Sequence, residues 1–447
     1  MRDLKYLTKQ RRYSAFLLKR KKKTLNTFKQ LHKNTMHLRI TLIVLAIVLA
    51  LYPFGFVIKT FAPKITSLMQ FSDKYARAST PEVDPYQSFH LVSQLLNSAR
   101  LQDNMFVTSM KDGGTVRFTI NAALQNRVMD VMQDNGVPFG VFVAIEPGSG
   151  KILALAGYSS IDPTWRQKSY FSLYPMASLF KIITAAAALE MNKVEPETNF
   201  EYRGYSYSED PKYWNIYPGQ SNQSMPLSLA MGKSINPVFG RLASDYVGTE
   251  SLMDYAQRFG FNQTLFPALP IAPSKAAVPQ DDRQLKLMGC GLGREVKISP
   301  FHAAVIMAAI ANQGEMMAPF MVQDVRDADN RMLYSIQARS IRRLVRSETA
   351  NQLTHMLLTT VTHGTSRKAF HDRHGRPLLD SVTVAAKTGS INGTNPAGHY
   401  SWFAAYAPVD KPKIALVALI VNQNKWKIKA SYLGAQALEQ FFDKNEL

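Results

Sequence analysis

The stretch YPMASLFKIITAAAALE, residues 174–190, carries both a structural and a chemical signal. Its alanine-rich second half predicts a helix over residues 178–191, because alanine has the highest intrinsic helix propensity. Residues three apart share one face of a helix, so the amine of Lys181 should lie beside the hydroxyl of Ser178. A serine hydroxyl is a weak nucleophile near neutral pH, and a lysine can act as its base when burial lowers the lysine pKa. The stretch therefore predicts a nucleophile and its base on one helix, although an N-capping serine followed by an exposed lysine has the same pattern.

A second short string, Ser-Ile-Asn at residues 234–236, follows fifty-six residues after the first. Pro237 favours the first turn of a helix, so Asn236 is expected at the end of a loop. A loop in this position would present the hydroxyl of Ser234 and the carboxamide of Asn236 to a cleft. The string is weak evidence by itself, because the same pattern recurs at residues 390–392.

A third string, Lys-Thr-Gly-Ser, ends the strand that we predict over residues 382–387. Gly389 would let a ligand backbone approach the strand edge, because glycine has no side chain to block it. Lys387, with the hydroxyls of Thr388 and Ser390, would bind a carboxylate. The alternative interpretation is a strand that simply runs out into a glycine turn.

Segments of strand character enclose a mainly helical middle. One β-hairpin is predicted where FVTSM and TVRFTI flank the turn KDGG, and another where FGVFVAIE and KILALAGY flank PGSG. Further strands are expected at 401–406 and 413–422, and further helices at 122–134, 300–311 and 430–443. Strands at both ends with helices inserted between them predict one α+β domain whose sheet joins the two ends.

Charge and hydropathy set the first residues apart from the rest of the chain. The formal net charge is +20, and residues 1–39 hold thirteen Lys and Arg against one acid, Asp3. Residues 40–58 are apolar apart from Thr41, and as a helix they would span about 28 Å, close to the thickness of a bilayer's hydrocarbon core. A basic tail can bind nucleic acid, but beside an apolar span it predicts a cytoplasmic tail, with no nucleic-acid partner. The long basic region and the lack of a small-residue cleavage site argue against a cleaved signal peptide.

These patterns divide the chain into a basic cytoplasmic tail (1–39), a transmembrane helix (40–58), a short membrane-proximal stalk (59–114) and a catalytic domain (115–447). The predicted location is the cytoplasmic membrane, crossed once, with the N-terminus inside and the catalytic domain periplasmic. Cys290 is the only cysteine, which excludes a disulfide within the chain and a thiolate zinc cluster. Neither a metal nor a cofactor is expected.

In chain order, Ser-x-x-Lys, Ser-x-Asn and Lys-Thr-Gly resemble the motif set of penicillin-binding proteins and serine β-lactamases. The flanking segments TINAALQNRVMDVM, VFVAIEPGSGKILALAGY, ISPFHAAVIMAAIANQGEMMAP, VTHGTS and YSWFAAYAP are similar to transpeptidase-domain segments of that family. Together they cover residues 115–447. The chain thus resembles a monofunctional, class B-like penicillin-binding protein, and the resemblance implies an antiparallel sheet flanked by helices.

The resemblance implies a role for each residue of the first two strings. Ser178 would attack the carbonyl of the penultimate D-alanine and form an acyl-enzyme, and Lys181 would take its proton. Ser234 would pass a proton toward the leaving group, and Asn236 would hydrogen-bond the peptide backbone of the substrate.

The third string would hold the donor peptide. Lys387 and Thr388 would bind its terminal carboxylate, and Gly389 would let its backbone approach the strand. The backbone amides of Ser178 and Ser390 would form the oxyanion hole, whose donors stabilise the charge that develops in the transition state.

The implied function is a peptidoglycan D,D-transpeptidase that acts on D-Ala-D-Ala stem peptides and is inhibited covalently by β-lactams. A D,D-carboxypeptidase would share the acylation chemistry but pass the acyl group to water. A β-lactamase would share the three motifs, but the predicted membrane anchor argues against it. A non-catalytic penicillin-binding sensor or scaffold is disfavoured by the single apolar span and the intact motifs.

Two departures from the family pattern bear on function. About fifty residues separate the apolar span from the domain, too few for the glycosyltransferase domain of bifunctional relatives, so a separate membrane glycosyltransferase is an expected partner. Ala405 stands where many relatives have glycine in the strand after Lys-Thr-Gly, and we expect it to narrow the floor of the cleft slightly.

Overall fold

The computed structural model describes Leu96 and residues 98–443, apart from short gaps at 103–104, 111, 220–221, 268, 270 and 380–381. All of these residues fall within one compact unit of the chain. The basic tail, the predicted transmembrane helix and most of the predicted stalk lie outside them and stay predictions. Among the residues that the structure describes, no helix combines the length and the apolar character needed to cross a bilayer.

A five-stranded antiparallel sheet in the order β14-β15-β16-β4-β5 forms the centre of the domain. Its strands are β4 (Phe139–Ile145), β5 (Ile152–Tyr158), β14 (Ala385–Thr394), β15 (Ala397–Ala407) and β16 (Ile414–Asn422). Every residue of β4 and of β16 is buried, as expected of strands covered on both faces. Because β16 pairs with β4, the sheet joins the two ends of the domain, which confirms the predicted α+β arrangement.

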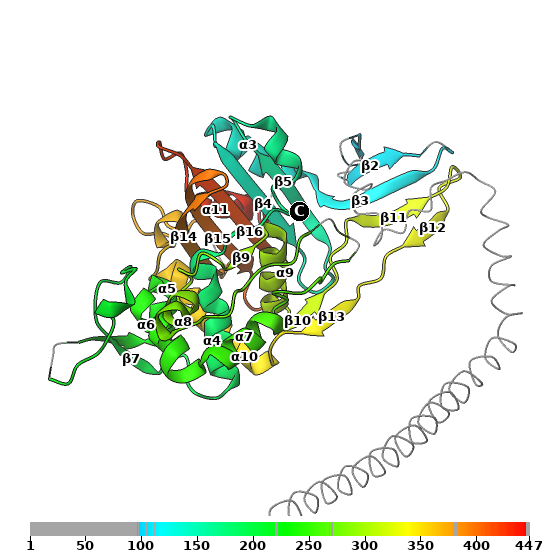
Figure 1. Ribbon diagram of the computed structural model, residues 1–447. Coiled ribbons are helices and arrows are strands. Elements are labelled where there is room, and N and C mark those ends of the chain that lie inside the picture. The colour runs from blue at the N-terminus through cyan, green and yellow to red at the C-terminus, as the bar shows by residue number, and fades with distance from the viewer. Residues whose placement is uncertain are drawn as a thin grey trace, which may run out of the picture. The chain divides into compact units, whose positions relative to one another are not determined.

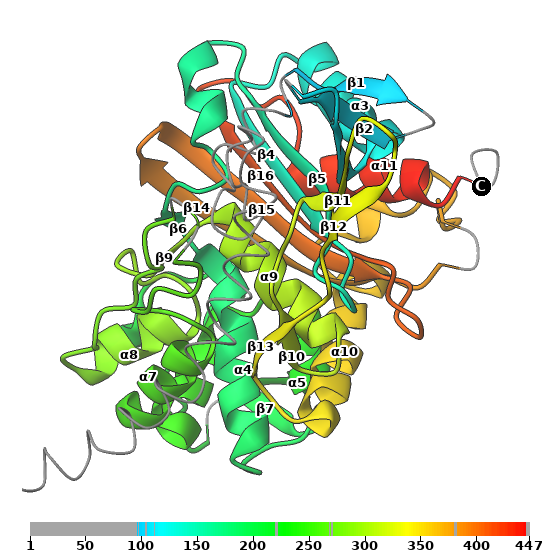
Figure 2. The same cartoon turned by 90° about the vertical axis from the view of Figure 1, so that its right-hand side faces the viewer.

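Helices cover both faces of this sheet, as Figures 1 and 2 show. Helices α3 (Ala122–Asp134) and α11 (Ala430–Phe441) pack on one face, where they meet side chains such as Phe142. Helix α9 (Pro300–Ala311) packs on the other face, against side chains such as Val141. The alternation of side chains along each strand explains why neighbouring residues of β4 belong to different hydrophobic clusters.

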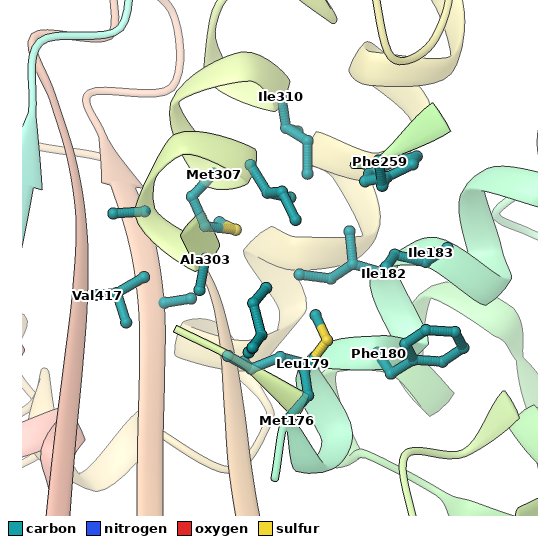
Figure 3. Close-up of a cluster of buried hydrophobic side chains, with 14 of the residues drawn as sticks. Met176, Leu179, Phe180, Ile182, Ile183, Phe259, Ala303, Met307, Ile310 and Val417 are labelled. Atoms are coloured by element: carbon teal, nitrogen blue, oxygen red, sulfur yellow. The ribbon is translucent and has the colours of Figure 1, made fainter. Parts of the chain in front are cut away.

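The remaining helices form a lobe on the α9 side of the sheet. They are α4 (Lys181–Glu190), α5 (Leu227–Lys233), α6 (Asn236–Arg241), α7 (Thr249–Arg258), α8 (Asp282–Gly289) and α10 (Ser347–Thr362), with the short helical turns η2 (Ala177–Phe180), η3 (Pro211–Tyr213) and η4 (Leu242–Val247). Outside this lobe, η1 (Pro163–Gln167) packs beside β5, and η5 (Arg367–Ala369) contacts both α10 and α11. Figure 3 shows buried side chains of η2, α4, α9 and β16 gathered in one cluster. This packing fixes the start of α4 against the sheet.

A second antiparallel sheet has the order β1-β2-β3-β11-β12. Its strands are β1 (Arg100–Gln102), β2 (Met105–Ser109), β3 (Thr115–Asn121), β11 (Val322–Arg326) and β12 (Met332–Ser335). Three more sheets have two strands each: β6 (Tyr174–Pro175) with β9 (Lys297–Ile298), β7 (Asn199–Tyr202) with β8 (Gln223–Pro226), and β10 (Glu315–Met317) with β13 (Ser340–Arg343). The pairing of β2 with β3 confirms the first predicted hairpin. The buried carboxylate of Asp324 on β11 accepts hydrogen bonds from Arg117 on β3, which ties these two strands together.

Candidate active site

The backbone around Ser178 is held in an unusual conformation. Ser178 lies in η2, which continues directly into α4, so the predicted helix forms with a 3₁₀ first turn. The preceding residue, Ala177, has a φ of 53°, a left-handed conformation that costs energy for a residue with a side chain. Gly291 packs so closely that an added Cβ would lie 2.1 Å from the carbonyl oxygen of Ala177. Tertiary contacts therefore impose the turn that carries the predicted nucleophile.

Lys181 is fully buried and has three polar partners. Its Nζ lies 2.7 Å from Ser178 Oγ, 2.8 Å from Asn236 Oδ1 and 2.6 Å from the carbonyl oxygen of Cys290. The amide and backbone carbonyl oxygens can only accept hydrogen bonds, so they take two N–H groups of a neutral amine. The lone pair of that amine then faces Ser178 Oγ. This geometry suits removal of a proton from the serine.

The environment of Lys181 also favours its neutral form. Burial lowers the pKa of its amine to about 8, from the value of 10.5 that is usual for lysine. With this pKa, about a tenth of the lysine is neutral at pH 7 and about half at pH 8. Lys181 can therefore act as a general base near neutral pH, which an exposed lysine does far less well.

The third partner of Lys181 comes from the loop that follows α8. Thr184, one turn after Lys181 on the same face of α4, donates a hydrogen bond of 2.8 Å to the carbonyl oxygen of Gly289. Lys181 and Thr184 thus hold two successive carbonyls at the end of α8, those of Cys290 and Gly289. Sequence analysis missed the contribution of Cys290 because it comes from a backbone oxygen, which any residue could supply.

The second string connects the two buried lysines. Ser234 ends α5 in a left-handed conformation with φ 58°, and Asn236 is the first residue of α6, next to the predicted loop. Asn236 accepts a hydrogen bond from Lys181, and Ser234 Oγ accepts one of 2.8 Å from Lys387 Nζ. The structure therefore brings the first and third strings together through the second.

Lys387 is fully buried as well, and its amine also donates to the carbonyl oxygen of Thr388 at 2.8 Å. Burial, and then the nearby charge of Lys181, hold the pKa of Lys387 well below its usual value. An entering carboxylate would reverse this effect, because an opposite charge stabilises the protonated amine.

The predicted end of the strand at Lys387 is wrong. Strand β14 begins at Ala385 and continues through the third string to Thr394, paired residue by residue with β15. Gly389 opens no turn; it lies in the strand opposite Trp402. A Cβ at Gly389 would lie 3.2 Å from the Cβ of Ala177, a tight contact, so the missing side chain eases the approach of β14 to the turn that carries Ser178.

Strand β14 is an outer strand of the central sheet, and Ser390 on it is exposed. The strand therefore passes beside the half-buried Ser178 with an edge that has no neighbouring strand within the described sheet. An extended peptide could pair with such an edge. The assignment of the Ser178 and Ser390 amides to an oxyanion hole agrees with this arrangement and stays a prediction.

Sequence analysis assigned no role to Thr365, although it lies in the quoted segment VTHGTS. Its hydroxyl is hydrogen-bonded to the hydroxyl of Thr388, and its amide donates to the carbonyl oxygen of Gly232 at 3.0 Å. Thr365 thus links the end of α5, close to Ser234, with the third string. The similarity of its segment to the family was the available signal, and its contact with Thr388 could not be inferred from it.

The expected effect of Ala405 on the cleft is wrong. Ala405 pairs with Ala386, and both are buried with α3 and α11 on the far face of the sheet. The neighbouring residue Ala404 is the one opposite Lys387, and it belongs to the cluster on the α9 side. Side chains alternate along a strand, so alanine in place of glycine at position 405 changes the packing against α3 and α11 and not the floor of the cleft.

The site thus combines a half-buried hydroxyl, a buried amine with a lowered pKa and a second buried amine next to an open strand edge. Such a set of groups can carry out acyl transfer by way of a serine ester. In the part of the chain that the structure describes, His, Cys, Asp and Glu side chains do not gather in threes that could hold a metal ion.

Comparison with known proteins places these groups in a family. The penicillin binding protein transpeptidase domain matches residues 140–443. The chain is 29% identical over 343 residues to the peptidoglycan D,D-transpeptidase PbpA of Mycolicibacterium smegmatis, a match that covers 69% of this chain and 67% of that protein.

Solved structures agree with this match. The crystal structure of PBPA from Mycobacterium tuberculosis is 26% identical, with a TM-score of 0.61, over 73% of this chain and 80% of that one. The penicillin G acyl-enzyme complex of penicillin-binding protein A from the same organism has a TM-score of 0.60 and 26% identity, over 74% of this chain and 81% of that one. The family match spans well over half of the 447 residues and includes all three strings. The chain therefore belongs to the penicillin-binding protein transpeptidase domain family.

Proposed function

We propose that this protein is a peptidoglycan D,D-transpeptidase that cross-links stem peptides through an acyl-enzyme on Ser178, and that penicillin acylates the same hydroxyl. The observation that carries the proposal is the arrangement of the Lys181 amine. Two carbonyl oxygens occupy its N–H groups, and its remaining position faces Ser178 Oγ at 2.7 Å.

The first half of the reaction forms the acyl-enzyme. Ser178 Oγ attacks the carbonyl carbon of the penultimate D-alanine, and Lys181 Nζ takes the hydroxyl proton. The bond between that carbon and the amide nitrogen breaks, and the terminal D-alanine leaves once its nitrogen gains a proton. Ser234 would deliver this proton and take one in turn from Lys387, whose amine donates a hydrogen bond to its hydroxyl.

The second half transfers the acyl group to an acceptor. An amine of a neighbouring stem peptide attacks the ester carbon, and its surplus proton passes through Ser234 to Lys387, which replaces the proton given to the leaving D-alanine. The ester bond breaks, Lys181 returns the proton it took to Ser178 Oγ, and the new amide is the cross-link. If water takes the place of the amine, the same residues make the enzyme a carboxypeptidase.

Binding of the donor peptide depends on the third string. Its terminal carboxylate would meet the Lys387 amine and the hydroxyl of Thr388, which Thr365 orients. Its backbone would lie along the open edge of β14, where Gly389 leaves room beside Ser178. This placement would bring the scissile carbonyl to the nucleophile.

We also propose that the protein is anchored in the cytoplasmic membrane by residues 40–58, with its catalytic domain outside and a separate membrane glycosyltransferase as a partner. The thirteen basic residues before the apolar span support this orientation. Protease added to intact spheroplasts should degrade the catalytic domain. Protection of that domain would refute the orientation.

The function is tested with penicillin and with an acyl acceptor. Labelled benzylpenicillin should form a stable adduct that peptide mapping places on Ser178, and Ser178→Ala should form none. A D-Ala-D-Ala peptide should be hydrolysed slowly, and an added amino acceptor should divert its product to the amide. An adduct that persists in Ser178→Ala would refute the nucleophile, and rapid release of D-alanine without capture by any acceptor would favour the carboxypeptidase.

A further inference from the structure

Four large aromatic side chains are exposed on the loop between β7 and β8. We name residues 203–219 the tyrosine loop. The exposed fractions of its side chains are 89% for Tyr205, 64% for Tyr207, 58% for Tyr213 and 47% for Tyr217. Several exposed aromatic residues in one segment are more typical of an interaction surface than of an ordinary protein surface.

The tyrosine loop is attached directly to the active site. The backbone N–H of Asn236 donates a hydrogen bond of 2.8 Å to the carbonyl oxygen of Ser206, and its side-chain Nδ2 donates one of 3.2 Å to that of Ser208. Since Asn236 Oδ1 accepts from Lys181, one asparagine connects the loop to the general base. Tyr205 and Tyr207 flank Ser206, so their backbone lies beside the second string.

A buried tryptophan anchors the loop. Trp214 is fully buried, and its Nε1 donates a hydrogen bond of 3.0 Å to Ser208 Oγ. Its ring packs on α6, where a Cβ at Gly240 would lie only 2.3 Å from the ring. The exposed tyrosines therefore stand on a fixed support, and a ligand that binds them need not order the loop first.

The loop is electrically neutral, although the whole chain has a net charge of +20. Arg203 and Lys212 balance Glu209 and Asp210, and Lys212 pairs with Asp210 at 3.0 Å. An anionic ligand would find no excess positive charge here. Arg203 and Lys212 lie over the rings of Tyr217 and Tyr213. The rings of Tyr205 and Tyr207, together with the phenol hydroxyls, suit a neutral ligand rich in hydroxyl and C–H groups.

We propose that the tyrosine loop binds the saccharide backbone of a peptidoglycan strand, beside the cleft in which the attached stem peptide reacts. The C–H faces of sugar rings stack on aromatic rings, and phenol hydroxyls hydrogen-bond to sugar hydroxyls. The inference rests on the proposed function, because it takes the substrate to be a glycopeptide. By this proposal the loop helps to select the substrate. A peptidoglycan strand would bind both the tyrosine loop and the catalytic cleft, whereas a free peptide would bind the cleft alone.

Removing the stem peptides with an amidase would leave a carboxylate on each muramic acid, which the basic residues 1–39 would attract. The test therefore uses the full chain in detergent and uncharged strands of β-linked N-acetylglucosamine. The wild type should bind these strands, and the double variant Tyr205→Ala/Tyr207→Ala should bind them about tenfold or more weakly, a typical loss when aromatic contact residues are truncated. Tyr432→Ala is the matched control, because Tyr432 is 42% exposed but lies on α11, on the far face of the sheet. Tyr205→Phe should retain most of the affinity, because it keeps the stacking ring.

Penicillin acylation of Ser178, measured on the same samples, separates this inference from the proposed function. Acylation without glycan binding by the wild type would overturn the inference and leave the function standing. Glycan binding without acylation would support the inference and refute the function. If the double variant loses acylation as strongly as glycan binding, the loop serves only to position Asn236, and the inference is wrong.

Discussion

The two buried lysines of the active site have the same side chain but different hydrogen-bond partners. Lys181 is surrounded by two carbonyl oxygens and the Ser178 hydroxyl, whereas Lys387 contacts the Ser234 hydroxyl and one carbonyl oxygen. Burial lowers the pKa of both amines. The comparison teaches that burial makes either lysine able to lose a proton, and that the neighbouring oxygens decide which one serves the nucleophile and which one is left for the substrate.

The first prediction removes the base. Lys181→Ala should keep the fold but slow acylation by benzylpenicillin by about a hundredfold or more, because a positioned general base commonly contributes that much. Stopped-flow measurement of adduct formation gives the rate, and circular dichroism gives the fold. Acylation at nearly the normal rate would show that another group takes the proton. The assignment of Lys181 as the base, and of Lys387 as the substrate-binding lysine by contrast, would then be wrong.

The second prediction removes the other amine. Lys387→Ala should weaken acylation by benzylpenicillin about ten- to a hundredfold, the effect of a lost hydrogen bond to a charged group. The methyl ester of benzylpenicillin is the matched control, because it has no free carboxylate for Lys387 to hold. The wild type should prefer the free acid, and the variant should lose that preference. A variant that still prefers the acid would mean that the carboxylate binds elsewhere.

The third prediction concerns pH. Because burial lowers the pKa of Lys181 to about 8, its neutral form increases as the pH rises through that value. The acylation rate should therefore rise about tenfold between pH 7 and pH 9 and then level off. A rate that climbs steadily toward pH 10.5 would assign the base an ordinary lysine pKa and contradict the buried environment of Lys181.

Local rules were sufficient for several parts of the molecule. Helical spacing alone placed Lys181 beside Ser178, and the structure confirms it at 2.7 Å. Alternating apolar residues and glycine-containing turns located both hairpins, and the helices predicted at 122–134 and 300–311 form with the same bounds. These features depend on residues close together in the chain, so a single sequence contains the information.

Contacts between distant segments decided the rest. The Cys290 carbonyl that completes the Lys181 site, the left-handed Ala177 and the Thr365–Thr388 contact all depend on backbone brought together from distant parts of the chain. Backbone carbonyls are the same in every residue, so no side-chain pattern reports which of them will meet an amine.

The sequence by itself determined that a serine and a lysine share one helical turn, that two more polar strings follow in order, and that strands at both ends enclose helices. The tertiary structure alone decided that β14 continues through Gly389 and that Ala405 faces α3 and α11. A strand's length and its buried face depend on what packs against it. Here the pairing with β15 and the close approach of Ser178 set the length and the buried face of β14. The residues of the strand alone do not encode these contacts.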